Sequence, residues 1–167
     1  MANIRQLVNF RLDDRRYALS LTTVERVVRS AELTPLPGSP EIILGVLNVH
    51  GNLMPAVRIR QRFNLPSRPP SINDHFVIAR TSRRAVILPV DAALGVLEYP
   101  EDRIVDSAAV APRLEYVSGI LKLEDGLILI HDLDTFLSFD EEEVLDKAMK
   151  EYQAPSTPKD KETRSRQ

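Results

Sequence analysis

The chain has 167 residues, of which 28% are charged, and its formal net charge is −2. A chain of this length can bury a hydrophobic core without a disulfide or metal staple, and it contains no cysteine for disulfides or thiolate sites. The slightly negative charge argues against a nucleic-acid-binding surface, and no apolar run approaches the ~18 residues that cross a bilayer. The charged N-terminal segment is unlike a secretory signal. These features indicate a soluble, globular protein of the cytoplasm.

The sequence carries few of the motifs that accompany catalysis. It has no glycine-rich phosphate-binding motif, and its three histidines, His50, His75 and His131, do not have the spacing of a metal site. We therefore expect no catalytic residue, no cofactor and no metal ion.

Short apolar segments with period-two alternation dominate the first half of the chain, which predicts strands joined by tight turns. The expected elements are, in chain order, a hairpin of strands 8–12 and 17–21, a β-branched segment at 22–28 that fits a helix or a strand, about one helical turn entered at Ser39-Pro40-Glu41, and a hairpin of strands 46–49 and 53–59 around His50-Gly51-Asn52.

The second half continues the same pattern and ends in a helix. The expected elements are a proline-rich break at 66–71, strands at 75–80, 85–90 and 94–99, a polar segment at 101–115, a hairpin of 116–123 and 127–130 around Glu124-Asp125-Gly126, a helix at 140–152, and a disordered tail from 153 to 167. Ser138 or Asp140 can cap the helix, and its apolar stripe is expected to pack on the strands. Short strands with little room for crossover helices predict antiparallel barrels or a sandwich.

One segment is distinctive: GVLNVHGNLMPAVRIRQRFNLP, residues 45–66. It resembles the signature of the CheW-like chemotaxis coupling proteins. The matching positions are Gly45, Asn48, Gly51, Pro55, Val57, Arg60, Arg62 and Phe63. Three further segments resemble the same family in the same order: Phe10 to Val28, Leu88-Pro89-Val90-Asp91 with Val96-Leu97, and Tyr116 to Asp134. The resemblance covers residues 7–139.

The resemblance implies a mostly β fold of two SH3-like, five-stranded β-barrel subdomains that share a core, over residues 1–139. It also implies a non-enzymatic adaptor of two-component signal transduction. Such an adaptor couples methyl-accepting chemotaxis receptors to the regulatory domain of a CheA-like histidine kinase, in chemotaxis or a related motility pathway, without binding nucleic acid or entering the membrane.

The resemblance further implies two partner-binding surfaces. The receptor's helical hairpin tip would lie in a groove between the barrels, where buried Val and Leu side chains each contribute roughly 1.5–3 kcal/mol. The positions that match the receptor groove are Leu21, Val24, Val27, Gly45, His50 and Gly51. The kinase surface matches, more loosely, Val77, Ile78, Asp132 and Leu133.

Two positions depart from the family pattern. His50 stands where the family has arginine, and Arg58 stands where it has aspartate. Histidine cannot form the bidentate fork of a guanidinium, so the first change affects a predicted partner contact. If the two positions are coupled in the family, the change at one position would compensate for the change at the other.

Two alternatives follow from the residues themselves. Arg58, Arg60 and Arg62 alternate, so on one strand they would form a basic stripe of a small nucleic-acid-binding barrel, although the net charge predicts weak binding. An enzyme would need His50 to meet Asp132 or Asp134 in a cleft.

Overall fold

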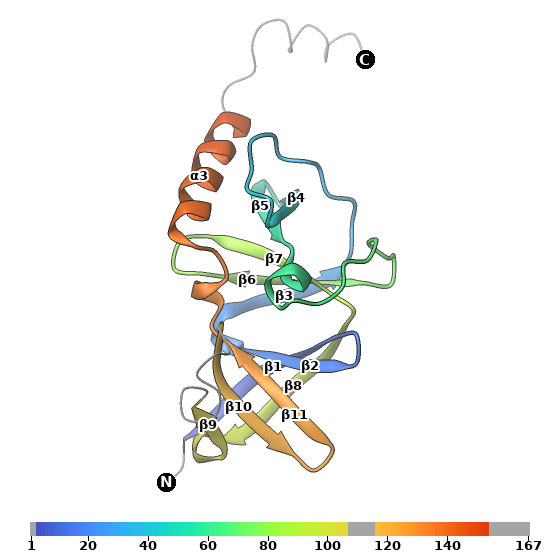
Figure 1. Cartoon of the computed structure of the whole chain (residues 1–167), viewed down its shortest axis with the longest axis vertical. Helices are drawn as coiled ribbons and strands as arrows, with labels where there is room; N and C mark the ends of the chain where they lie inside the picture. Colours follow the sequence, from blue (N-terminus) through green and yellow to red (C-terminus); the bar gives the residue numbers. More distant parts are fainter. Residues whose placement is uncertain (1–2, 107–115, 154–167) are drawn as a thin grey trace, which may run out of the picture.

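The computed structural model describes residues 3–106 and 116–153, which form two β-sheets and one long helix (Figure 1). The predicted tail from 154 onward and residues 107–115 of the predicted polar segment lie outside the described residues. The elements are β1 (Ile4–Leu12), β2 (Arg15–Ser20), η1 (Leu21–Thr23), β3 (Val24–Arg29), β4 (Ile43–Val49), β5 (Asn52–Val57), α1 (Ile59–Arg62), β6 (His75–Arg80), β7 (Ala85–Val90), β8 (Ala92–Pro100), η2 (Glu101–Arg103), β9 (Ile104–Asp106), β10 (Val117–Leu123), β11 (Gly126–His131), η3 (Leu133–Thr135) and α3 (Phe139–Gln153).

The two sheets are interleaved in sequence. The six-stranded sheet has the order β8-β1-β2-β11-β10-β9, and the five-stranded sheet has the order β3-β6-β7-β5-β4. All strands of the five-stranded sheet lie between β2 and β8 in the chain, and Figure 1 shows this sheet above the six-stranded one. Most pairings are antiparallel, as predicted, but β2 with β11 and β5 with β7 are parallel.

The expected mostly β architecture of two lobes with a shared core is confirmed. One core cluster takes side chains from both sheets and from α3, including Phe10, Leu88 and Leu145. A second cluster lies within the six-stranded sheet, and a third lies within the five-stranded sheet. Because one cluster belongs to both lobes, neither sheet can move without disturbing the packing of the other.

The predicted hairpins are confirmed, and the ambiguous segment at 22–28 comprises the end of the short helix η1 and most of strand β3. The helical entry at Ser39 amounts to a single turn, closed by the hydrogen bond from the Ile43 N–H to the Pro40 carbonyl. The short strand β9 was not predicted. The predicted basic strand face is wrong, because β5 ends at Val57 and the chain turns into α1 between Arg58 and Arg62.

The β4–β5 turn explains several residues of the signature segment. His50 and Gly51 form a two-residue loop in which both φ angles are positive, at 51° and 86°, as a type I′ turn requires. The Gly51 N–H donates to Asn48 Oδ1 at 2.8 Å. Asn48 and Gly51 therefore stabilise the turn that presents His50 to solvent.

The terminal helix begins with the predicted capping box. The Glu141 N–H donates to Ser138 Oγ at 3.1 Å, and the Ser138 N–H donates back to Glu141 Oε1 at 2.8 Å. Leu145 and Ala148 are buried in the shared core, as expected from the stripe. None of the helices in residues 3–106 and 116–153 combines the length and apolar character that a membrane span requires.

Candidate functional site

We call the five-stranded sheet the upper lobe and the six-stranded sheet the lower lobe. The candidate site is the seam between them, which we define as the region where η1, β6 and β7 meet β1 and β8. β1 contacts η1 and β7, and β8 contacts β6. The strand β3, which follows η1, is an edge strand of the five-stranded sheet, and β8 is an edge strand of the six-stranded sheet. Edge strands leave main-chain groups and outward side chains open to a partner.

Three of the predicted receptor-groove residues lie together on the edge of the five-stranded sheet. Leu21 and Val24 are half-buried, whereas Val27 is 38% exposed. Sequence reasoning missed two further apolar residues, Leu94 and Val96, which are 43% and 53% exposed on the opposite edge strand β8. Their period-two spacing predicted a strand, but only the sheet order reveals an edge.

The other three predicted groove residues belong to the β4–β5 hairpin, on the opposite edge of the five-stranded sheet. Gly45 is buried, and a Cβ atom there would lie 2.7 Å from the Thr34 carbonyl oxygen. Thr34 forms a bridge with Val46, so the segment that follows β3 is drawn onto β4. Gly45 therefore has a packing role, because only glycine lets this segment approach so closely.

Three of the four predicted kinase-contact residues are buried. Val77 and Ile78 are fully buried on opposite faces of β6, where Val77 packs in the shared core and Ile78 packs inside the five-stranded sheet. Leu133 is also buried. A central strand covered on both faces reads as a continuous apolar run, which is why these residues were mistaken for a surface. Asp132 is exposed and caps η3 through the Asp134 N–H.

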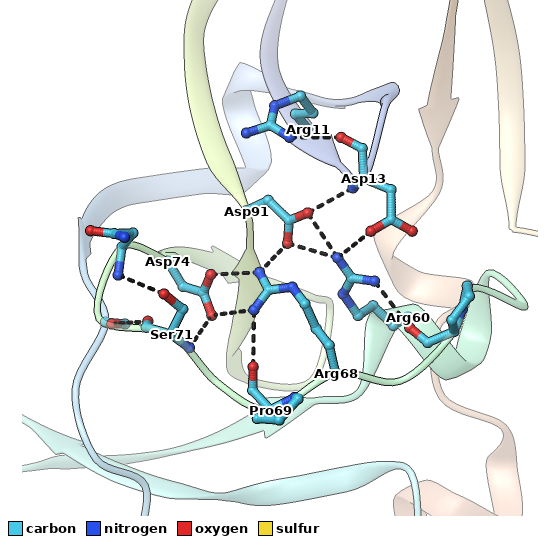
Figure 2. A network of polar contacts seen from close by, with 11 residues as sticks. Arg11, Asp13, Arg60, Arg68, Pro69, Ser71, Asp74 and Asp91 are labelled. Atoms are coloured by element: carbon cyan, nitrogen blue, oxygen red, sulfur yellow. Dashed lines mark hydrogen bonds and ion pairs between the residues drawn. The ribbon is translucent and has the colours of Figure 1, made fainter.

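A group of charged side chains, which we call the charged hub, joins the two lobes beside the seam (Figure 2). It consists of Asp13, Arg60, Arg68, Asp74 and Asp91. Asp91 is the single residue between β7 and β8, so it stands where the chain passes from one sheet to the other. Asp13 lies in the β1–β2 turn, and Arg60 lies in α1, which follows β5.

The hub is held by short contacts around Asp91. Arg60 Nη2 donates to both Asp91 carboxylate oxygens, at 2.8 and 2.9 Å, and to Asp13 Oδ1 at 2.8 Å. Arg68 contacts the same carboxylate and also Asp74, whose Oδ1 is 2.6 Å from its Nη2. Figure 2 shows the two guanidinium groups reaching Asp91 from different sides. The Asp13 N–H donates to Asp91 Oδ2 at 2.7 Å.

The environment of Asp91 favours its charged form. Burial alone raises the pKa of Asp91, but the hydrogen bonds from Arg60, the Asp13 N–H and Arg68 together hold it below its ordinary value. The side chains of Asp91 and Arg60 are only 12% and 14% exposed. Pairs this far from water are weakly screened, so they specify geometry more effectively than surface ion pairs.

The hub also joins two motif segments that are distant in sequence. Arg60 comes from the signature segment and Asp91 from the segment around Leu88, and no local sequence pattern indicates that they pair. The arginines offered as a basic stripe are occupied: Arg60 pairs with Asp13 and Asp91, Arg62 pairs with Glu141, and Arg58 Nε donates to the Glu41 carbonyl. The nucleic-acid-binding alternative is therefore not supported.

The two departures from the family pattern lie at opposite ends of β5. His50 lies in the β4–β5 turn, whereas Arg58 follows the other end of β5. The acid–base cluster of an enzyme is not assembled. Asp132 and Asp134 accept backbone hydrogen bonds from Asp134 and Ser82, and no hydrogen bond joins either to His50 in the part of the chain described. Within the same residues, no group of three or more His, Asp or Glu side chains could hold a metal ion.

An aromatic cluster covers the other side of the shared core, where β11 ends. The His131 ring stacks on Phe63, with 4.0 Å between ring centroids, and lies near Tyr17 and Phe136. Its Nδ1 hydrogen-bonds the Tyr116 carbonyl at 3.0 Å. Burial lowers the pKa of His131 to about 4, an effect partly opposed by that hydrogen bond. His131 is therefore a neutral core residue at neutral pH.

Comparison with known proteins assigns this architecture to a family. The family model for the CheW-like domain matches residues 6–141 of the chain. The chain belongs to the CheW-like family. It is 27% identical over 141 residues to the chemotaxis protein CheW of Rhizobium meliloti, covering 83% of this chain and 91% of that protein. It is 26% identical to the CheW of Thermotoga maritima, covering 79% and 87%.

Solved structures support the same assignment. The chain superposes on the crystal structure of the scaffolding protein TtCheW from Thermoanaerobacter tengcongensis with a TM-score of 0.74 and 27% identity, covering 84% of this chain and 96% of that one. This CheW-like protein is a chemotaxis coupling adaptor in signal transduction. Proteins of the CheW-like family are scaffold adaptors, which argues against an enzymatic role.

Proposed function

We propose that this adaptor joins methyl-accepting chemotaxis receptors to the regulatory domain of a CheA-like histidine kinase, in the cytoplasm, as part of chemotaxis or a related motility pathway. The family match over residues 6–141 carries this proposal. A coupler needs two binding surfaces at a fixed separation. The shared core and the charged hub support that requirement, because both connect the two lobes of the molecule.

The receptor tip is proposed to lie along the seam. Leu21, Val24 and Val27 offer apolar contacts there, and the exposed Leu94 and Val96 extend the apolar surface on β8. An amphipathic helix laid on such side chains removes apolar area from water, which is the usual basis of helix-in-groove binding. His50 and Gly51, at the exposed tip of the β4–β5 hairpin, are proposed to contact the receptor separately, because this hairpin lies on the opposite edge of the five-stranded sheet, and the buried Gly45 is proposed to support the hairpin from within.

The kinase is proposed to bind the lower lobe near the end of β11. Asp132 is exposed there, while the buried Leu133 supports the backbone from beneath. Val77 and Ile78 are proposed to contribute only by keeping β6 in place, because their side chains are enclosed.

The receptor proposal is tested by Val27→Asp. Docking against Val27 would leave the new carboxylate without water or a partner, so we expect isothermal titration calorimetry with a receptor tip peptide to show at least about a tenfold loss of affinity. Affinity for the kinase regulatory domain should stay within about twofold, because the proposed kinase surface is elsewhere.

Val144→Asp is the matched control, because Val144 is 46% exposed on α3, away from the seam. Equal losses in both variants would contradict the proposed groove. If the unmodified protein binds neither the receptor tip nor the kinase domain of its own organism, the proposed coupling function is wrong.

A further inference from the structure

Helix α3 crosses from one lobe of the molecule to the other. It follows β11 of the six-stranded sheet through η3 and then runs beside the five-stranded sheet (Figure 1). Leu145 and Ala148 enter the shared core, with 0% and 3% of their surfaces exposed. The family match ends at residue 141, so most of this helix lies beyond the matched domain.

The first attachment of α3 is at its N-terminal end. Arg62 Nη2 donates to both carboxylate oxygens of Glu141 at 2.8 Å, and Arg62 Nη1 lies 3.3 Å from the Tyr116 hydroxyl oxygen. Arg62 belongs to α1, which follows β5, whereas Tyr116 immediately precedes β10. Tyr116 also accepts hydrogen bonds at its carbonyl from His131 and from the Asp132 N–H. Arg62 thus joins Glu141 of α3 to the upper lobe, and through Tyr116 the same arginine reaches the start of the β10–β11 hairpin.

The second attachment is to the β6–β7 turn. Arg84 in this turn pairs with Glu142 at 2.9 Å and also with Asp146. The side chains of Arg84 and Glu142 are 14% and 9% exposed. The neighbouring Ser82 N–H donates to Asp134 Oδ1 at 2.7 Å, so η3 is attached to the same turn.

The chemistry of these attachments suits a positioning role. Apolar residues of similar size would anchor a helix about as firmly, because buried ion pairs incur a desolvation cost that offsets their attraction. Hydrogen-bonded ion pairs differ in being directional, so they favour particular alignments of donors and acceptors. Two such attachments, on successive residues Glu141 and Glu142, fix both the position and the rotation of α3.

We propose that α3 is a brace that holds the β10–β11 hairpin in one position relative to the five-stranded sheet. The brace also sets the relative position of the receptor and kinase surfaces, an inference that rests on the proposed coupling function. Removing it would leave each surface able to bind its own partner while weakening the effect of one partner on the other.

The test uses Glu141→Gln in the full chain. Glutamine can still complete the capping box, so the helix keeps its start while the ion pair with Arg62 is lost. Hydrogen exchange followed by mass spectrometry should show at least about tenfold faster exchange in β10–β11, relative to β6–β7 of the same protein. Glu142→Gln should instead accelerate exchange in α3 and in the β6–β7 turn.

Glu143→Gln is the matched control, because Glu143 lies in the same helical turn and is exposed. It should leave exchange in both sheets unchanged. If Glu141→Gln accelerates exchange only within α3, or equally in both sheets, the brace is refuted.

A binding measurement separates this inference from the proposed function. We expect Glu141→Gln to change the affinity for the receptor tip alone, and that for the kinase domain alone, by less than twofold. The ratio of receptor affinities measured with and without bound kinase domain should fall about tenfold. An unchanged effect would contradict the positioning role. Failure of the unmodified protein to bind either partner would refute the proposed function, while the exchange experiment would still decide whether α3 is a brace.

Discussion

Single polar residues connect parts of this adaptor that its hydrophobic core alone would leave less precisely aligned. Asp91 accepts from two arginines and one backbone N–H at the point where the chain passes between sheets. His131 stacks in the aromatic cluster with its Nδ1 bonded to the Tyr116 carbonyl. Each makes its contacts in one geometry only, so each is a sensitive point at which to test the structure.

Replacing Asp91 with asparagine should destabilise the protein. The amide preserves the shape but removes the charge that both Arg60 and Arg68 share, while each arginine keeps one other carboxylate. We expect the free energy of unfolding in urea to fall by about 1.5–3 kcal/mol, the range for lost hydrogen bonds to charged groups. Asp14→Asn, in the exposed β1–β2 turn, should change it by less than about 0.5 kcal/mol. Similar losses in the two variants would contradict the hub.

His131 should make stability depend on pH. Its pKa is about 4 in the folded protein, because of burial, and about 6.5 in the unfolded chain. The folded state binds the proton less readily, so its stability is complete above about pH 6.5 and declines as the pH falls toward 4, by about 3 kcal/mol in all.

Urea unfolding of the wild type and of His131→Phe between pH 7 and 4 tests this expectation. Phenylalanine preserves the ring stack but does not titrate, so the variant should lose most of the decline in that window. Asp91 and Glu141, whose pKa values are lowered by their arginine and backbone partners despite burial, lose their contribution mainly below about pH 5, and they do so equally in both proteins. An identical slope in the variant would show that another group is responsible.

At the scale of elements, the close approach of the segment after β3 to β4 links the two edges of the five-stranded sheet. The bridge between Thr34 and Val46 uses both backbone hydrogen bonds, at 2.8 and 2.9 Å. Gly45 lies beneath this bridge. Gly45 of the signature segment thus allows the segment after β3 to pair with β4 in the upper lobe, independently of any role in binding.

Gly45→Ala should weaken the bridge between Thr34 and Val46. The new Cβ would lie 2.7 Å from the Thr34 carbonyl oxygen, and moving that backbone costs roughly 1–3 kcal/mol, measurable by urea unfolding. Amide exchange at Thr34 and Val46 should accelerate. Gly51→Ala is the informative comparison, because it is strained by its φ of 86° but meets no neighbouring atom, so exchange at Thr34 should not change. Equal effects at Thr34 would argue against the contact.

At the scale of the whole molecule, three features act together on the relation between the lobes. The shared core joins them through apolar packing, and the charged hub joins them at the chain crossing. Helix α3 follows β11 of the lower lobe in the chain and is attached to the upper lobe by ion pairs with Arg62 and Arg84. The apolar packing keeps the two lobes from separating, whereas the charged groups keep one lobe from rotating or sliding relative to the other. An adaptor that transmits a signal by geometry needs both restraints.

The sequence predicted the local parts of this design well and the long-range parts poorly. Hairpins follow from neighbouring residues: turn formers such as Gly51 and Gly126 stand between period-two strands. The Arg60–Asp91 and Arg84–Glu142 pairs join residues far apart in the chain, and no local pattern marks them. The alternation from Arg58 to Arg62 misled because it continues unbroken while the backbone changes from strand to helix.

The candidate site was predicted unevenly for the same reason. Whether an apolar residue faces water or a second layer depends on its place in the sheet, so Val77 and Ile78 could not be separated from Val27 by sequence alone. Leu94 and Val96 were missed because their exposure depends on β8 being an edge strand.

The interleaving of the two sheets has a consequence for how the protein is made. β2 and β11 are neighbours in the six-stranded sheet, although β2 ends at Ser20 and β11 begins at Gly126. As the ribosome releases the chain from its N-terminus, every strand of the upper lobe emerges before β8 does. The strands of the upper lobe can therefore pair with one another during translation. The outer edges of the β1–β2 hairpin remain unpaired until β8 and β11 have been synthesised. During that interval, the β1–β2 hairpin is the segment that a nascent-chain chaperone would need to shield.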